Sequence, residues 1–552
     1  MMMTIVGRSL LMGKYVIGLD YGTLSARALL VEADNGHAAA TAEFVYPHGV
    51  ITDQLPEGWA LQHPQDYLDA LYWLIPMIMT GIASDDVVGL GLDFTACTAF
   101  PVDAQGMPLC FDPRWQHEPH AYAKLWKHHA AQQRADQITQ IAKERREHWL
   151  NSYGGKVSGE WGLPKLWELL DEAPTLYQAM HTWIEAGDWL VWQLTGQESR
   201  NLCAASFKHF YRQGIGYPTP DFYRAIDPRM SRLIEDKFSA PVIPAGKRAG
   251  QLTESMAHRL GLSAGIAVSA ACVDAHAAIP AAGLTEPGEM LAIIGTSTCV
   301  MTLAQEAHPV PGICGTALDA ILPGYYACEA GQSCVGDLLG WFCDHCVPAE
   351  YQAKAKENGQ SIHQYLTALA EGLKPGESGL LALDWWNGNR SILVDFDLSG
   401  LLLGMTLQTK PEEIYRALIE ATAFGLRVIV EHFRQHGVPV EKLFATGGIS
   451  RKNAMAMQIY ADVLNLPVRI VETEQGAALG SAIYAASAAG CYASMREAVR
   501  HMAAPVSRIY TPNPDHVKNY DALYHEYKRL HDLFAQDGVM KRLKNLKQKT
   551  PV

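Results

Sequence analysis

The chain has 552 residues, and its 45 Lys and Arg stand against 58 Asp and Glu, which gives a formal net charge of −13. Hydrophobic residues are 48% and charged residues 19%, so disordered, collagen-like and coiled-coil chains are excluded. A prior of about 150 residues per domain predicts two to four domains. Because the balance is acidic, no nucleic-acid partner is expected.

The cysteines and the apolar segments bear on the compartment. Eleven scattered cysteines are typical of a reduced, cytoplasmic chain. Cys343 and Cys346 form one C-x-x-C pair without the second pair that a zinc site usually needs, so two thiols on a helix are the favoured interpretation. Residues 1–13 lack the features of a signal peptide. Residues 475–495 carry no charge, but their Ala, Gly and Ser content predicts a buried helix, and no membrane partner is expected.

The first elements form a predicted hairpin. A strand over 15–20 ends in Asp20, a Tyr-Gly-Thr turn follows, and a second strand covers 26–32. An Asn-Gly turn at 35–36 then leads into a third strand. Helical patterns follow over residues 64–79, 120–149, 163–172 and 182–194.

The same local pattern returns about half the chain later. Residues 289–294 read as a strand, Gly295-Thr296-Ser297-Thr298 as a turn, and 299–303 as a second strand. The repetition fits a duplication into two similarly built halves, and it also fits a chance match between two short motifs.

Strands and helices alternate after residue 400. A long helix opens after Thr409 and stops before Gly437, and the last stretch, 513–548, is polar and helical with a basic end. Between them we expect a strand over 443–446, a Gly447-Gly448 turn, a helix over 452–464, a strand over 468–471 and a helix over 475–489. This alternation predicts α/β layering with a mainly parallel sheet.

The two Gly-Thr turns are candidate phosphate sites. The chain contains neither a Walker A sequence nor G-x-G-x-x-G. A Gly-Thr turn instead exposes backbone N–H groups and hydroxyls, and glycine permits a phosphate to come close. Asp20, beside the first turn, is placed to hold Mg²⁺ through water. The alternative for each turn is an ordinary hairpin with small residues. The candidate phosphate contacts are Gly22, Thr23, Gly295, Thr296 and Ser297.

Asp274 is the candidate general base. It follows the apolar run 266–273 and is flanked by small residues that leave room for a substrate. A partly desolvated carboxylate can accept a hydroxyl proton. The alternative is an aspartate that caps a helix starting at Ala275.

Five stretches in this order resemble the FGGY carbohydrate kinases over nearly the whole chain. They are IGLDYGTLSARALL from residue 17, VDAHAAIPA from 273, IGTSTC from 294, ATGGISRKNAMAMQIYADVLNLPV from 445 and EQGAALGSAI from 474. The resemblance implies an α/β fold with two ribonuclease H-like domains, of the actin/hexokinase ATPase type, that flank a central cleft. It implies an N-terminal domain over 14–280, a C-terminal domain over 281–510 and a helical tail over 511–552.

Within the family, the chain is most similar to the members that phosphorylate L-ribulose. The stretches that carry this similarity lie outside the shared ATP machinery, for example WALQHPQDY from residue 59, HAYAKLWKHHAA from 120 and YACEAGQSCVGDLLGWF from 326. The resemblance implies ATP and Mg²⁺ as cofactors and a cytoplasmic homodimer. It implies Asp274 as base, Asp20 and Asp274 at the metal, sugar contacts from Ala96, Lys208, Glu329, Asp93 and Trp126, and an adenosine pocket with Gly447, Gly448 and Asn453.

Three functions are therefore considered, and they are given in order of preference. The first is ATP-dependent phosphorylation of L-ribulose to L-ribulose 5-phosphate in L-arabinose catabolism. The second is the same reaction on another ketopentose or polyol, such as D-ribulose, D-xylulose or ribitol. The third is a non-catalytic ATP-dependent switch of the actin or chaperone type, which would share the hairpins but need no sugar base.

Overall fold

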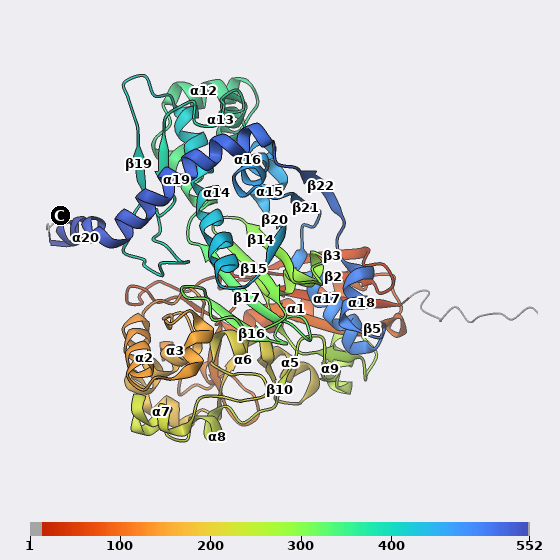
Figure 1. The fold of residues 1–552 in the computed structure, drawn as a ribbon. Helices are drawn as coiled ribbons and strands as arrows, with labels where there is room; N and C mark the ends of the chain where they lie inside the picture. The colour runs from red at the N-terminus through yellow and green to blue at the C-terminus, as the bar shows by residue number, and fades with distance from the viewer. Residues whose placement is uncertain (1–13, 550–552) are drawn as a thin grey trace, which may run out of the picture.

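The computed structural model describes residues 14–549, so residues 1–13, in which no signal peptide is expected, lie outside the described part (Figure 1). Two seven-stranded sheets form the two halves of the chain. The first has the order β11-β12-β5-β1-β2-β3, with β13 paired to β5. Its strands are β1 (Tyr15–Tyr21), β2 (Ser25–Glu32), β3 (Ala38–Val45), β5 (Val87–Phe94), β11 (Arg248–Gln251), β12 (Ala267–Ser269) and β13 (Cys272–Val273).

The second sheet repeats the arrangement of the first. Its order is β16-β17-β15-β14-β20-β21-β22. The hairpin strands β14 and β15 are antiparallel and β14 is parallel to β20, just as β1 is antiparallel to β2 and parallel to β5. The predicted α/β layering and both predicted hairpins are therefore confirmed. The prediction of a mainly parallel sheet is wrong, because only the β14–β20 and β20–β21 pairs are parallel and the other pairs of this sheet are antiparallel. Its strands are β14 (Gly288–Ile294), β15 (Thr298–Ala304), β16 (Gly315–Leu318), β17 (Tyr326–Gln332), β20 (Val440–Thr446), β21 (Val468–Val471) and β22 (Val506–Tyr510).

A helix from the second half packs on the first sheet. The predicted small-residue helix is α17 (Gly476–Ala489), which lies against β1, β5 and α10 (Asp274–Ala281). The backbones come very close, since a β-carbon at Gly18 would lie 1.9 Å from the carbonyl oxygen of Ala478. Only small residues permit this approach, so the composition of α17 follows from its place between the halves.

Long helices cover the second sheet. They are α14 (Pro411–Gln435), α16 (Ala454–Leu464) and α19 (Pro514–Asp537), with α20 (Val539–Lys549) at the end of the described chain (Figure 1). Helix α19 buries Tyr520, Tyr524 and Tyr527 and packs on α14 and α16, so it is part of the second core. The domain boundaries given above stay a prediction.

The segments that connect β3, β5 and β11 in the first half are mainly helical. They include a small sheet of order β4-β7-β6-β8, formed by β4 (Leu61–Gln62), β7 (Ala123–Lys124), β6 (Ala99–Val102) and β8 (Thr182–Glu185). Their main helices are α1 (Pro64–Ile78), α2 (Gln132–Glu144), α3 (Gly162–Glu172), α5 (Ala186–Thr195) and α6 (Leu202–Lys208).

Two helix predictions in this region are wrong in part. Only 132–144 of the expected helix over 120–149 is α-helical, and 182–185 is a strand that precedes α5. The segment before α2 is a short strand followed by turns, because Lys124 and His128 both turn inward to Glu168 on α3. These tertiary contacts override the local periodicity.

The structure also bears on the cysteine and membrane predictions. Helix α11 (Gly336–His345) carries Cys343, which is buried, and Cys346 follows it and is exposed. Across residues 14–549, no group of three or more His, Cys, Asp or Glu side chains is arranged to hold a metal ion. No helix in the same range has the length and apolar character to cross a membrane.

Candidate active site

Three aspartates meet at one edge of the first sheet. Asp20 on β1 lies opposite Asp93 on the parallel strand β5, and Cys272 on β13 also lies opposite Asp93. The chain passes directly from β13 into α10, whose first residue is Asp274. The parallel register therefore brings Asp20, Asp93 and Asp274 to the carboxyl ends of neighbouring strands, where ligands bind in such sheets.

Burial and mutual repulsion keep these carboxyl groups difficult to ionise. Burial, followed by the charge of Asp20, raises the pKa of Asp274 to about 7. Burial also raises the pKa of Asp20, against the opposing effects of Asp93 and of Arg27 at 3.7 Å, and raises that of Asp93 well above its usual range. Asp274 Oδ1 accepts a hydrogen bond from the Ala275 N–H at 2.7 Å. A carboxyl group with a pKa near 7 suits a general base.

The aspartates fit a hydrated divalent cation. Ser481 on α17 donates to Asp93 Oδ2 at 2.7 Å, while Asp93 Oδ1 is buried and has no hydrogen-bond partner among residues 14–549. A nearby cation would relieve the repulsion that raises these pKa values. Mg²⁺ uses one or two carboxylates and keeps several waters, so a preformed cage of three protein ligands is not required. Asp20 and Asp274 as metal ligands stay a prediction.

The two Gly-Thr turns have related hydrogen bonding. The Gly22 N–H donates to Ser25 O at 3.0 Å, and the Gly295 N–H donates to Ser297 O at 2.9 Å. Both glycine amides are thus used inside their own turns, so the donors left for a phosphate come from the residues that follow. The Val335 and Gly336 N–H groups, at the start of α11, bond to carbonyls of the second turn.

The predicted sugar contacts Lys208 and Glu329 bind each other across the two halves. Lys208 Nζ, at the end of α6, lies 2.9 Å from Glu329 Oε2 on β17. Arg390 Nη2 lies 2.7 Å from Glu329 Oε1, and His276 Nε2 lies 3.3 Å from Glu329 Oε2. Burial alone would raise the pKa of Glu329, but these three cations hold it well below its usual range.

The cluster around Glu329 is cationic. Burial opposes protonation of His276, but Cys203 at 2.9 Å and Glu329 raise its pKa to about 9. One carboxylate therefore faces three positive groups. His276 lies two residues after Asp274 on α10, so the same helix connects the candidate base with the cluster. Such a set of charged donors can hydrogen-bond the hydroxyls of a sugar.

Ala96 and Trp126 lie on two neighbouring segments. Ala96 follows β5 in a turn closed by a 2.8 Å hydrogen bond between the Thr95 and Thr98 hydroxyls. Trp126 follows β7, has a side chain that is 40% exposed, and donates from Nε1 to Thr23 Oγ1 at 3.1 Å. Trp126 thus lies beside the first Gly-Thr turn. Sugar contacts from Ala96, Trp126, Lys208, Glu329 and Asp93 stay predictions.

The predicted adenosine residues lie beside the second turn. Gly447 follows β20, which pairs with β14 through Ile293 and Thr446. Gly447 has a φ of 102°, and a β-carbon there would lie 2.4 Å from Ile294 O, so a side chain is excluded. Around a β-carbon at Gly448 the space is open. Asn453 Oδ1 accepts from the Ala456 N–H at 2.9 Å and caps α16, a structural role. The ATP role of this set stays a prediction.

Arg390 and Ser481 were not identified from the sequence. Arg390 belongs to an irregular Asn-Gly-Asn-Arg-Ser segment, and only its contact with Glu329 marks it. Ser481 is hidden among the small residues of α17. An arginine between asparagine and serine in a segment of turn-forming residues was the one available signal for Arg390, and none existed for Ser481.

Comparison with known proteins identifies the relatives of the chain. Family models match residues 15–280 as the N-terminal domain and 290–489 as the C-terminal domain of the FGGY family of carbohydrate kinases. A ribulokinase from Bacillus licheniformis is 51% identical over 538 residues, covering 95% of this chain and 98% of that protein. A ribulokinase from Geobacillus thermodenitrificans is 48% identical over 550 residues, covering 97% of each.

Solved structures show the fold. The xylulose kinase of Rhodospirillum rubrum has a TM-score of 0.77 at 23% identity, covering 95% of this chain and 100% of that one. A ligand-bound xylulose kinase from Lactobacillus acidophilus has a TM-score of 0.79 at 18% identity, covering 95% and 99%. The expected fold class, two α/β halves of the actin/hexokinase-like ATPase type, is confirmed.

Proposed function

The chain belongs to the FGGY family of carbohydrate kinases, and from this premise we propose that it transfers the γ-phosphoryl group of ATP to the terminal hydroxyl of L-ribulose. The product would be L-ribulose 5-phosphate, formed in the catabolism of L-arabinose. The observation that carries the proposal is the position of Asp274 between the aspartates of the first sheet and the Lys208–Glu329 cluster. That position suits a base that acts on a sugar hydroxyl. The curated ribulokinases named above support the substrate.

Asp274 is the base of the proposed reaction. Its carboxylate accepts the proton of the terminal hydroxyl while the oxygen forms a bond to the γ-phosphorus, and the bond from that phosphorus to the β,γ-bridging oxygen breaks to release ADP. With a pKa of about 7, a substantial fraction of Asp274 is ionised at neutral pH and can accept the proton. The carboxylic acid that Asp274 then becomes can release the proton again near neutral pH. Mg²⁺, when bound, would neutralise charge on the phosphoryl oxygens.

The remaining residues position the reactants. Thr23, Thr296 and Ser297 offer backbone and hydroxyl donors to the phosphates from the two halves, and Lys208 and Arg390 orient the sugar. Phosphoryl transfer depends mainly on positioning and electrostatic stabilisation, so both halves must hold their ligands at once. Excluding water from the site would also suppress the hydrolysis of ATP.

A non-catalytic switch is the less favoured function. Such a protein would use the phosphate turns without a charged cluster of Lys208, Arg390, His276 and Glu329 beside the base. Kinases for D-ribulose, D-xylulose or ribitol would use the same phosphate turns and the same base. They would differ in where the site places the groups that hydrogen-bond the sugar hydroxyls. A cytoplasmic homodimer is part of the same proposal.

The test is a coupled ADP-release assay over L-ribulose, D-ribulose, D-xylulose and ribitol. We expect the highest kcat/KM with L-ribulose. We expect Asp274→Ala to lower kcat by about 10²–10⁴-fold, the usual contribution of a general base, while binding of a fluorescent ATP analogue changes little. If another sugar has the highest kcat/KM, that sugar replaces L-ribulose as the proposed substrate. Near-normal turnover by Asp274→Ala would rule out Asp274 as the base. No sugar-dependent ADP release at all would favour the switch.

A further inference from the structure

A buried amine on α3 has no carboxylate partner. The side chain of Lys165 is 0% exposed, and within residues 14–549 no carboxylate oxygen lies within ion-pair distance of its Nζ. Nζ instead donates to the carbonyl oxygens of Cys97 at 2.8 Å and Leu125 at 2.6 Å. An ammonium group buried without a counter-ion costs free energy unless hydrogen bonds compensate it. The hydrogen bonds to these two carbonyls are therefore what compensates the buried ammonium group of Lys165.

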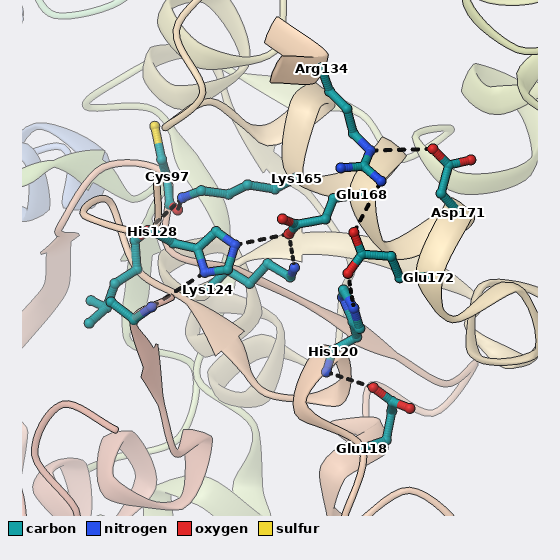
Figure 2. A network of polar contacts seen from close by, with 12 residues as sticks. Cys97, Glu118, His120, Lys124, His128, Arg134, Lys165, Glu168, Asp171 and Glu172 are labelled. Atoms are coloured by element: carbon teal, nitrogen blue, oxygen red, sulfur yellow. Dashed lines mark hydrogen bonds and ion pairs between the residues drawn. The ribbon is translucent and has the colours of Figure 1, made fainter. Parts of the chain in front are cut away.

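The two carbonyls belong to the neighbours of the predicted sugar contacts. Cys97 directly follows Ala96 in the turn after β5, and Leu125 directly precedes Trp126 in the segment after β7. These segments lie far apart in the sequence, and Lys165 is a single group that bonds to both. Figure 2 shows Lys165 reaching toward Cys97, with Lys124, His128 and Glu168 beside it.

Helix α3 fixes the Trp126 segment from both sides. Glu168 lies one helical turn after Lys165 and binds Lys124 and, at 2.9 Å, His128 Nε2 (Figure 2). Three side-chain contacts from one helix thus bracket Trp126. The indole of Trp126 in turn donates to Thr23 Oγ1, which links this segment to the first Gly-Thr turn.

The Ala96 turn needs support of this kind. Cys97 has a φ of 57°, a left-handed conformation that costs a residue other than glycine about 1 kcal/mol. The bond from Lys165 to the Cys97 carbonyl and the bond between the Thr95 and Thr98 hydroxyls hold this conformation. Without the ammonium group, the turn can relax and move Ala96.

We infer that Lys165 is a positioning residue that sets the separation between Ala96 and Trp126 and thereby determines which ketopentose the site accepts. The inference rests on the proposed function. Lys165 does not touch the sugar; it acts through the two carbonyls. A shift of about 1 Å in such a pair is enough to change a rate about 10²-fold.

The test compares Lys165→Met with Lys143→Met, an equivalent change at an exposed position on α2. For Lys165→Met we expect the KM for L-ribulose to rise about 10- to 100-fold, the KM for ATP to stay within about twofold, and the kcat/KM preference for L-ribulose over D-ribulose to fall. Lys143→Met should match the wild type in all three. A merely structural defect would lower the active fraction without splitting the two KM values.

Each remaining outcome is decisive. If Lys165→Met is insoluble, Lys165→Gln, which keeps an N–H donor for one carbonyl, is judged by the same criteria. If neither variant folds, Lys165 is needed for stability and the inference is overturned. The inference is also overturned if a folded variant keeps the wild-type sugar KM and sugar preference, or if it raises the KM values for sugar and ATP equally. A wild type that is inactive on all ketopentoses would instead overturn the proposed function.

Discussion

Buried carboxyl groups in this chain differ in how far nearby cations offset the effect of burial on their pKa. Glu329 has three cationic partners, and its pKa is depressed. Asp188 on α5 is also buried. Its Oδ1 accepts from the N–H and Nδ2 of Asn201, both at 2.8 Å, and these bonds and the charge of Arg200 offset burial only in part. Burial therefore raises the pKa of Asp188 to about 7, and its ionised form is costly at neutral pH.

This cost predicts a pH-dependent effect of Asp188→Asn. Since the folded pKa of about 7 exceeds the unfolded value of 3.8, the stability gained by holding the proton is complete below about pH 4 and is lost as pH rises through 7. The amide keeps an acceptor oxygen for Asn201 and cannot ionise. We expect the variant's advantage in free energy of unfolding to be larger at pH 8 than at pH 5 by on the order of 2 kcal/mol, measured by urea denaturation.

An exposed aspartate provides the control for this measurement. Asp221→Asn on α7 (Pro220–Ile226) changes the same group where the side chain is 71% exposed, and it should show little pH dependence. A difference between Asp188→Asn and the wild type that does not change with pH would contradict the assigned titration.

Single residues were predictable from the sequence where a local motif marked them. Asp20 ends an apolar run beside a turn, and Asp274 ends an apolar run among small residues; these patterns were enough to single them out. Arg390 and Lys165 carry no such mark, because their partners lie far away in the chain and are reached only after folding. The sequence thus predicted residues defined by their neighbours along the chain and missed those defined by contacts in space.

At the scale of elements, the crossing of α10 and α17 positions the candidate base. Asp274 begins α10, and a β-carbon at Gly480 on α17 would lie 1.7 Å from Ala277 O on α10. The obstacle is backbone, which cannot rotate away. The two helices can therefore cross at this distance only if residue 480 has no side chain.

Gly480→Ala should separate these helices and move Asp274. We expect a loss of about 1–3 kcal/mol in the free energy of unfolding and at least a tenfold loss in kcat, measured by denaturation and by the coupled assay. Gly340→Ala on α11 is the control, since a β-carbon there meets no atom within 4 Å. That variant should be active and stabilised by about 0.5–1 kcal/mol. Equal behaviour of the two variants would show that the crossing is not tight.

Elements followed from the sequence where their signals were local. Both hairpins, α3 and α17 were predicted because alternation, turn residues and composition specify them over a few residues. The expected helix over 120–149 was wrong because Lys124 and His128 bind Glu168, about 40 residues along the chain. The hydrophobic periodicity of a short stretch of sequence carries no information about a contact with a residue so far along the chain.

At the scale of the whole molecule, the two halves are joined by more than the chain between them. Lys156 Nζ donates to Val394 O at 3.0 Å, the Gly312 N–H donates to Gly154 O at 3.0 Å, and α17 from the second half packs on the first sheet. The repeated Gly-Thr turn predicted two similar halves. It did not predict that the chain would return to the first half through α17, because that packing is a contact between distant segments.

The C-terminal helices differ in how firmly they join the second half. On α19, the Tyr520 hydroxyl donates to Glu420 at 2.9 Å and the Tyr527 hydroxyl donates to Asp384 at 2.7 Å, both in the buried core. Helix α20 contributes one buried side chain to that core, Met540, and its other contacts include exposed ion pairs, such as Lys544 with Asp397 at 2.6 Å. Exposed pairs contribute little, whereas losing the two tyrosine hydroxyls removes a hydrogen-bond donor from each of two buried carboxyl groups.

Two truncations should therefore have opposite results. Deleting 539–552 removes the exposed ion pairs of α20 and a single core side chain, Met540, and we expect kcat/KM to stay within about twofold of the wild type. Deleting 513–552 also removes α19, whose buried tyrosines stabilise the second half by about 1.5–3 kcal/mol each, a sum close to the whole stability of a domain. That variant should be insoluble or should lose its cooperative urea transition. If it folds and is active, α19 is an appendage, and the tail predicted over 511–552 is independent of the second core.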